Sequence, residues 1–153
     1  MGKGLHMFGD KWNPVTGCTK FSEGCLHCYA LDRLIPQMKN EKYKNGGRLT
    51  CHYDLLDAPK IRKRPTRYFV NNMADVFHHD VPLDFLKELF ATMNSCPQHI
   101  FRLLTKRTER MLELAPLFQW TNNISMGVTV ESEKYLFRID DLRKVPVARK
   151  FVM

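Results

Sequence analysis

The sequence has no apolar stretch that approaches the ~20 residues of a membrane span, and its first residues lack the basic-then-apolar order of a signal peptide. We therefore expect a cytoplasmic protein without membrane contact. It also has no internal repeat, low-complexity tract or obvious linker. Its 153 residues suit one domain, residues 1–153, which is large enough to bury a core without stabilising disulfides or metal ions.

Acidic side chains are outnumbered by basic ones, 16 to 24, which gives a formal net charge of +8 at pH 7. A positive net charge attracts phosphates, nucleic acid or another anionic partner, and it does not indicate which of these binds. The basic residues are spread along the chain except in one run, residues 60–67, which is typical of a solvated loop. The substrate is therefore unknown, with an anion or nucleic acid as a candidate.

The five cysteines are an odd number, which argues against a disulfide framework. Three of them lie within eleven residues, in a Cys-x6-Cys-x2-Cys pattern: Cys18, Cys25 and Cys28. Thiolates suit iron–sulfur clusters and zinc, and Gly17 and Gly24 help the loop to bend. Three ligands leave one iron of a [4Fe–4S] cluster open to a substrate or cofactor. We expect Cys51 and Cys96 to be ordinary small residues that bind no metal.

Two other interpretations of this pattern stay open. Zinc requires a fourth ligand, and three histidines are available: His6, His27 and His52. The second cysteine pair of most zinc sites is absent. A thioredoxin-like redox role for Cys25 and Cys28 is the other alternative, although that motif normally lacks a third nearby cysteine.

The rest of the chain alternates between two kinds of apolar pattern. Strands are predicted over residues 67–72, 99–104, 124–130 and 147–153, and helices over 82–96, 109–118 and 133–145. The apolar face of the last helix is expected to contain four residues: Tyr135, Leu136, Ile139 and Leu142. Alternating strands and helices predict an α/β fold built from right-handed parallel βαβ units.

Three of the predicted strands end in polar residues or are followed by them, at the edge where ligands bind in such folds. They are Asn71, Asn72, Asp75, Thr105, Lys106, Arg107, Thr129 and Glu131. We expect them to line one opening at the C-terminal ends of the strands. Polar residues at strand ends equally often form only local hydrogen bonds. His78 and His79 follow the first group, and adjacent histidines in a loop are more often solvated than catalytic.

Several stretches in order resemble a phage-associated family of unknown function that has a radical-SAM-like three-cysteine motif. They are Trp12-Asn13-Pro14-Val15-Thr16-Gly17-Cys18, Cys25-Leu26-His27-Cys28-Tyr29-Ala30, Val70-Asn71-Asn72-Met73-Ala74-Asp75-Val76-Phe77-His78, Leu103-Leu104-Thr105-Lys106-Arg107 and Gly127-Val128-Thr129-Val130-Glu131. The match covers nearly the whole chain. One departure from common radical SAM enzymes is the six-residue first spacer, where three residues are usual, although His27 fills the aromatic position before the last cysteine.

The resemblance implies a partial, open βα-barrel of the radical SAM and TIM-barrel type, with about five parallel strands, in a bacterial host cell. It implies a [4Fe–4S] cluster on the three cysteines and S-adenosylmethionine (SAM) at the open iron, which is cleaved to start radical chemistry. The implied cofactor contacts are Asn71, Asn72 and Asp75 for the amino end of SAM and Thr129 and Glu131 for its ribose. Lys106 and Arg107 would meet an anionic substrate, and catalytic residues stay unknown.

A barrel with about five strands cannot close, and its last strand, near Phe151, would expose unpaired backbone groups. We therefore expect another copy, a partner chain or the N-terminal segment to cover this edge. The alternative function is a zinc-stapled module that binds nucleic acid or a partner without catalysis. An idle barrel that only binds a partner is a third possibility.

Overall fold

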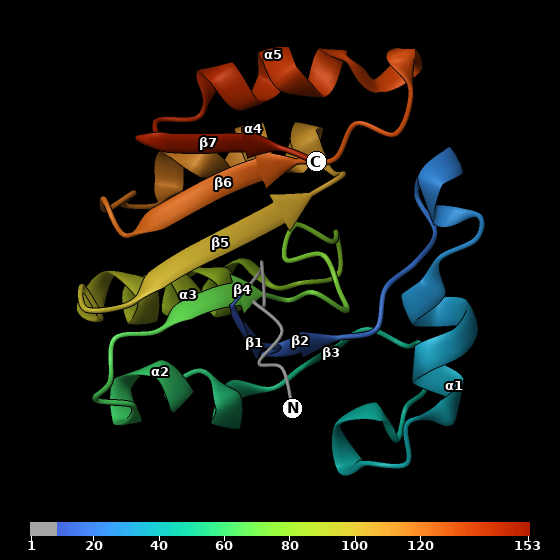
Figure 1. Ribbon diagram of the computed structural model, residues 1–153, viewed down its shortest axis with the longest axis horizontal. Coiled ribbons are helices and arrows are strands. Elements are labelled where there is room, and N and C mark those ends of the chain that lie inside the picture. Colours follow the sequence, from blue (N-terminus) through green and yellow to red (C-terminus); the bar gives the residue numbers. More distant parts are fainter. Residues whose placement is uncertain (1–8) are drawn as a thin grey trace, which may run out of the picture.

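The computed structural model describes residues 9–153, and its centre is a five-stranded sheet with the order β1-β4-β5-β6-β7 (Figure 1). The strands are β1 (Asp10–Trp12), β4 (Arg67–Val70), β5 (Ile100–Thr105), β6 (Ile124–Val128) and β7 (Arg149–Val152). All four neighbouring pairs are parallel, so the predicted open parallel sheet is confirmed. A separate antiparallel pair joins β2 (Val15–Thr16) to β3 (Thr50–Cys51).

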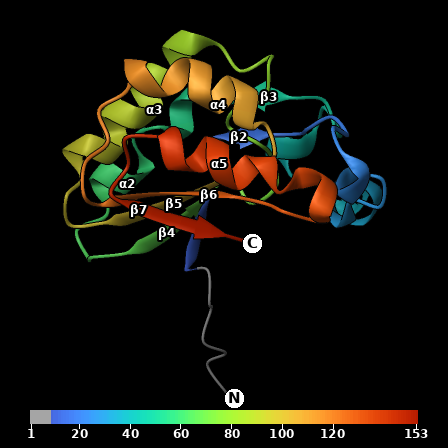
Figure 2. The same ribbon diagram turned by 90° about the horizontal axis from the view of Figure 1, so that it is seen from above.

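The helices lie on one side of this sheet. They are α2 (Ala58–Ile61), α3 (Leu83–Ser95), α4 (Thr108–Leu114) and α5 (Phe137–Lys144). Figure 2 shows α3, α4 and α5 over the same face, as right-handed crossovers between neighbouring parallel strands require. The short α1 (Ile35–Gln37) continues a π-helical turn, Ala30–Leu34, at the side of the sheet. Short 3-10 turns complete the set: Glu23–Cys25, Glu41–Tyr43, Tyr53–Leu55, Ala115–Leu117 and Glu133–Tyr135.

The core forms between the sheet and these helices. On β5, Phe101 and Leu103 are fully buried toward the helices, while Arg102 and Leu104 alternate with them and are half-buried. α3 falls within the helix predicted over residues 82–96, and one apolar face of it is buried along its whole length: Phe85, Leu86, Leu89, Phe90 and Met93. The alternate residues of β5 and the residues at helical spacing on α3 therefore pack together in one core.

Several predicted boundaries are wrong by a few residues. β4 ends at Val70 because Asn71 has a φ of 56°, in the left-handed region, and its N–H donates to the Trp12 carbonyl. The helix predicted over 109–118 ends at Leu114 and continues as a 3-10 turn that contains Pro116, which cannot supply the amide that an α-helix needs. The sequence does not predict strand β1, because three residues are too few to show the alternation of apolar and polar residues that marks a strand.

The predicted apolar face of the last helix is partly wrong. Tyr135 and Leu142 are buried, but Leu136 is 50% exposed, and Arg138 is buried in its place at 1% exposure. The segment opens with a 3-10 turn, Glu133–Tyr135. Because a 3-10 helix has three residues per turn and an α-helix 3.6, the residues after this turn face a different direction from the one that an α-helix alone predicts. A pattern of apolar residues therefore does not predict the buried arginine on this face.

Within the described residues, β7 pairs with β6 and no second strand. The predicted cover of this edge by another chain or by the N-terminal segment stays a prediction, since residues 1–8 lie outside the described part. No helix in residues 9–153 combines the length and the apolar character that crossing a membrane requires.

Candidate functional site

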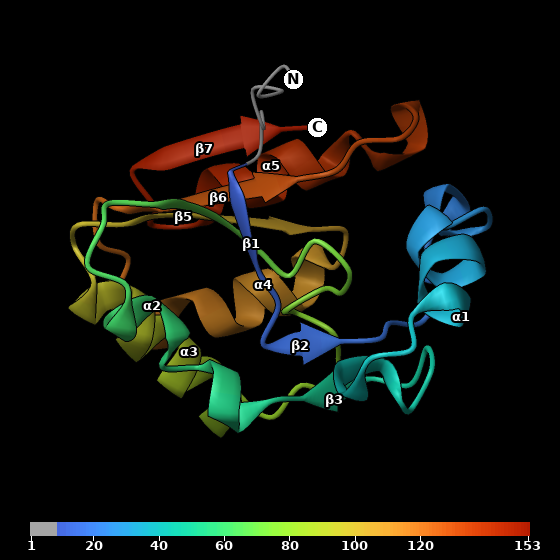
Figure 3. The same ribbon diagram turned by 60° about the horizontal axis from the view of Figure 1, so that its bottom comes forward.

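The segment with the three cysteines leaves β2 and runs past the C-terminal ends of the parallel strands (Figures 1 and 3). Gly17 makes the exit possible, because its φ is +77° and a Cβ there would lie 2.2 Å from the Arg48 carbonyl oxygen. The Cys18 N–H then donates to the Gly47 carbonyl at 3.1 Å. We call residues 17–29 the cysteine loop.

Local hydrogen bonds shape this loop around its thiols. Cys25 closes the 3-10 turn, and its N–H donates to the Ser22 carbonyl at 2.8 Å, while the Ser22 Oγ lies 3.8 Å from its sulfur. The Cys28 carbonyl accepts the Asp32 N–H at 2.8 Å, at the start of the π-helical turn. All three cysteines are free and half-buried, so their sulfurs are available for ligation.

Thr19, beside Cys18, is held from two directions. One Arg107 nitrogen donates to its carbonyl oxygen and to its hydroxyl, both at 3.0 Å. His78 Nε2 donates to the same hydroxyl at 2.7 Å, because His78 Nδ1 already accepts the Asp80 N–H at 3.2 Å. The Arg107 guanidinium also lies 4.5 Å from the centre of the Phe21 ring. The end of β5 and the loop after β4 therefore fix this part of the cysteine loop.

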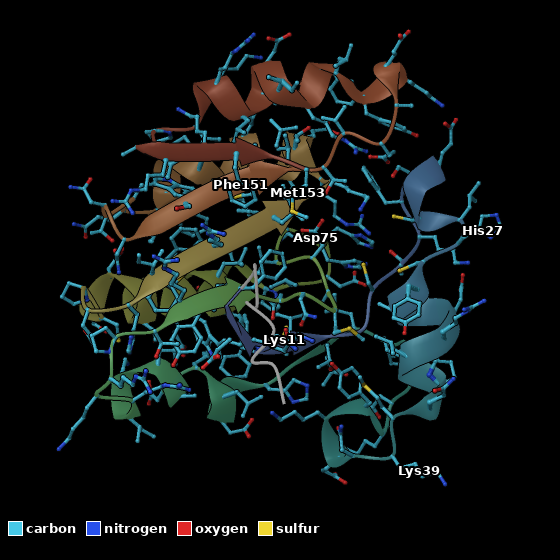
Figure 4. The ribbon with its side chains drawn as sticks, in the orientation of Figure 1. Lys11, His27, Lys39, Asp75, Phe151 and Met153 are labelled. Atoms are coloured by element: carbon cyan, nitrogen blue, oxygen red, sulfur yellow. The ribbon has the colours of Figure 1, made fainter. Side chains whose placement is uncertain are left out.

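Asp75 organises the residues behind this contact, beside the end of β5 (Figure 4). Its buried carboxylate accepts the Thr105 hydroxyl at 2.8 Å, the Phe77 N–H at 3.0 Å and the Lys106 N–H at 3.1 Å. Arg107 Nε lies 4.0 Å away. Burial raises the pKa of Asp75, against these donors and the arginine, which lower it. Asp75 thus orients the polypeptide from which Arg107 projects.

Glu131 joins the end of β6 to the other half of the loop. Its Oε1 accepts the Ser22 hydroxyl, and its Oε2 accepts Arg138 at 2.6 Å. Arg138 also donates to the Thr129 carbonyl at 2.8 Å. A Cβ on Gly24 would lie 3.0 Å from the Glu131 side chain, so a glycine there lets the loop approach closely.

The two ends of the loop give their thiols different acidities. Burial raises the pKa of Cys18, the charge of Asp75 adds to this, and a hydrogen bond from Arg107 opposes it. Burial also acts against ionisation of Cys25, but hydrogen bonds at Ser22 outweigh it, and the pKa of Cys25 is lowered. Cys25 is therefore the more readily ionised of these two, and the thiolate is the form that binds metal.

Two buried polar atoms at the end of β4 have no hydrogen-bond partner among the described residues: Asn71 Nδ2 and Asn72 Oδ1. The rest of each residue is engaged. Asn71 Oδ1 accepts the Val15 N–H, and the Asn72 N–H donates to Asn13 Oδ1, both at 3.0 Å. An unpaired buried polar atom costs about 1–3 kcal/mol, so this donor and acceptor are suited to a polar ligand.

The structure thus gathers most of the predicted site residues, and their predicted roles stay predictions. Asp75, Arg107 and Glu131 hold the cysteine loop, the charge of Lys106 acts on Cys25, and Thr129 contributes its carbonyl. Sequence reasoning missed three supporting residues: Thr19, Ser22 and Arg138. The interpretation of His78 as solvated is wrong, because it is fully buried. No local pattern marks Thr19 or Ser22, since their partners His78 and Glu131 are distant in sequence.

The ligands considered for zinc are not gathered around the cysteines. His27 is exposed and points away from the sheet (Figure 4), His52 Nε2 is bonded to the Thr16 hydroxyl at 2.8 Å, and His6 lies outside the described residues. A tetrahedral zinc site needs ligand atoms roughly 3.8 Å apart. Among residues 9–153, the one group of three whose ligand atoms lie within 4.8 Å of one another contains no cysteine; it is His78, His79 and Asp80.

Comparisons with known proteins agree with this architecture. The structure is similar to that of a mutant of spore photoproduct lyase, with a TM-score of 0.59 and 14% sequence identity. The match covers 93% of this chain and 43% of that chain, so this chain spans less than half of the neighbour's length. The predicted fold class, an α/β fold with an open βα-barrel of about five parallel strands, is confirmed. A comparison with curated proteins found no match. The family model described as "Protein of unknown function (DUF5131)" matches residues 5–153, and the chain belongs to this family.

Proposed function

We propose that this protein is a radical-SAM-like enzyme that holds a [4Fe–4S] cluster on Cys18, Cys25 and Cys28 and cleaves SAM. The observation that carries the proposal is a loop with three free thiols, fixed by polar strand ends at the mouth of an open βα-barrel. Ligands of parallel α/β folds bind at this edge.

The donor set suits a cluster better than a single ion. The three sulfurs do not converge to the spacing of a zinc site, and a cubane cluster takes its cysteines at separate corners. Three cysteines leave one iron without a protein ligand, and such a cluster, when bound, supplies the electron that cleaves the sulfonium bond of SAM. The lowered pKa of Cys25 favours the thiolate that holds iron. Free thiols of this kind suit a reducing compartment such as the cytoplasm.

The residues predicted to bind SAM divide into supports and contacts. The carboxylate oxygens of Asp75 and Glu131 already accept hydrogen bonds from the cysteine loop and from the ends of the strands. We therefore assign these two residues to positioning the loop. Asn71 and Asn72 keep an unpaired donor and acceptor, and Asn72 lines a cavity of about 380 Å³. We assign these two amides to the amino and carboxylate groups of SAM, and the Thr129 hydroxyl to its ribose.

The test is anaerobic reconstitution with iron and sulfide, followed by reduction in the presence of SAM and chromatography of the products. We expect wild-type protein to bind iron and to form 5′-deoxyadenosine and methionine. Cys25→Ala should lose both iron and product, while Cys51→Ala, a half-buried cysteine of β3, should keep both. Fully loaded protein that neither binds nor cleaves SAM would contradict the proposal. Protein that holds zinc and no iron would favour the binding module.

A further inference from the structure

The face of the sheet opposite α3, α4 and α5, which we call the open face, has an unusual row of side chains. The register of the four strand pairs aligns one residue from each strand: Lys11, Phe69, Arg102, Ser125 and Arg149. Three of the five are basic and none is acidic. Neighbouring strands lie ~4.8 Å apart, so Lys11 and Arg149 are about 19 Å apart along the row.

Two cavities open onto this row, and no acidic residue lines either of them. One, of about 360 Å³, is lined by Phe69, Arg102, Ser125, Arg149, Lys150, Phe151 and Met153. The other, of about 380 Å³, is lined by Lys11, Phe69, Asn72, Leu104 and Met153. Phe69 and Met153 border both, so the cavities form one continuous trough. Through Asn72 the trough reaches the end of β4, at the edge of the sheet along which the cysteine loop runs (Figure 1).

An aromatic ring lies in the next row of the trough. Leu104, Gly127 and Phe151 are aligned there, and a Cβ on Gly127 would lie 2.4 Å from the Phe151 ring. The glycine therefore lets the ring lie against the strand. Figure 4 shows Lys11 near one edge of the sheet, and Phe151 on β7 and Met153 just after this strand toward the other.

The two outer cations of the row have no carboxylate partner in the described part of the chain. Lys11 and Arg149 are exposed and form no ion pair there, whereas Arg62 pairs with Asp10 and Lys20 pairs with Asp32. Unneutralised cations along a trough without acidic residues create a positive potential that attracts a polyanion. A single phosphate cannot span them, but a chain of phosphates can.

We infer that the open face binds single-stranded nucleic acid, with phosphates along Lys11, Arg102 and Arg149 and a base stacked on Phe151. The inference rests on the proposed function, because it names the substrate class of that enzyme. A stacked strand rises ~3.4 Å per nucleotide, so the row matches roughly five or six nucleotides, within the ~4–16 of known single-strand sites. Cations interleaved with aromatic rings are the usual composition of such sites.

The test is fluorescence anisotropy of the full chain without cluster, titrated with a labelled single-stranded oligonucleotide of mixed sequence at several salt concentrations. Three phosphate contacts predict a slope of log K against log salt of about −2. Lys11→Gln and Arg149→Gln should each weaken binding and reduce the slope by about 0.7. Phe151→Leu should weaken binding about tenfold without changing the slope. Arg143→Gln, which removes the same charge from exposed α5, should leave both values unchanged.

Equal effects of Arg149→Gln and Arg143→Gln would overturn the inference, because binding would then depend on net charge alone. A mononucleotide that competes as well as the oligonucleotide, or a duplex that binds better, would also overturn it. The assay needs neither cluster nor SAM, so its failure is distinguishable from failure of the proposed function. Protein that cleaves SAM but shows no site-dependent binding would keep the enzyme and exclude this substrate class.

Discussion

Replacing Arg138 with methionine tests how the end of β6 supports the cysteine loop. Arg138 is 1% exposed, donates to Glu131 at 2.6 Å and to the Thr129 carbonyl at 2.8 Å, and stacks 4.2 Å from the Tyr135 ring centre. Methionine keeps the apolar stem but leaves the Glu131 carboxylate without its cation. Removing one partner of a buried ion pair costs about 3–5 kcal/mol. Because Glu131 remains 15% exposed, we expect the lower end, about 3 kcal/mol.

The assay is urea unfolding, with Arg143→Met as the matched control. Arg143 pairs with Asp140 on the surface, with side chains 72% and 66% exposed, so its loss should cost less than about 1 kcal/mol. Although burial acts the other way, the Ser22 hydrogen bond and Arg138 hold the pKa of Glu131 below its usual value. That stability exists above the unfolded pKa of ~4.3 and is lost as the pH falls, so the deficit of Arg138→Met should shrink in acid. Equal unfolding free energies for the two variants would refute the reasoning.

Three further predictions follow from single contacts. Gly17→Ala should lower the unfolding free energy by more than about 1 kcal/mol in urea, because its Cβ would meet the Arg48 carbonyl at 2.2 Å with φ at +77°; unchanged stability would contradict the described turn. Gly127→Ala should cost about 1 kcal/mol in the same assay, the lower end for overpacking, because the Cβ would meet the Phe151 ring at 2.4 Å and this half-buried ring must turn aside; unchanged stability would contradict the described contact. Burial lowers the pKa of His78 to about 4, so the unfolded chain takes up this proton first, and wild-type stability should fall as the pH drops from about 6.5 toward 4. His78→Gln, which keeps a donor for Thr19, should flatten that pH profile, and an unchanged profile would count against a buried neutral histidine.

The long periodic elements could be predicted from sequence because their burial pattern is local. Alternation over residues 124–130 predicts β6, and the apolar spacing of Phe85, Leu89 and Met93 predicts α3. The polar residues after the strands predict one functional edge, since the carboxyl ends of parallel strands meet there. The cysteine spacing alone indicates a soft metal centre, but it does not decide the position of each sulfur.

The supports of the site could not be predicted, because they depend on contacts between distant segments. Thr19 and His78 are 59 positions apart, and Ser22 and Glu131 are 109 apart. A three-residue strand such as β1 contains too few residues to show a period. Arg138 is buried by a change of helical phase after a 3-10 turn, which composition does not reveal. The row of cations on the open face also appears only once the strand register is known.

The central claim is that three cysteines hold a cluster with one open iron, and electron paramagnetic resonance tests it most directly. The spectrum of anaerobically reconstituted and reduced protein should be recorded with and without SAM. We predict a reduced [4Fe–4S] signal that changes when SAM is added, because SAM binds the iron that lacks a cysteine. The signal should disappear in Cys18→Ala and remain in Cys96→Ala, whose cysteine is buried in the core at 1% exposure. A cluster signal that SAM leaves unchanged, or one that survives in Cys18→Ala, would contradict the account.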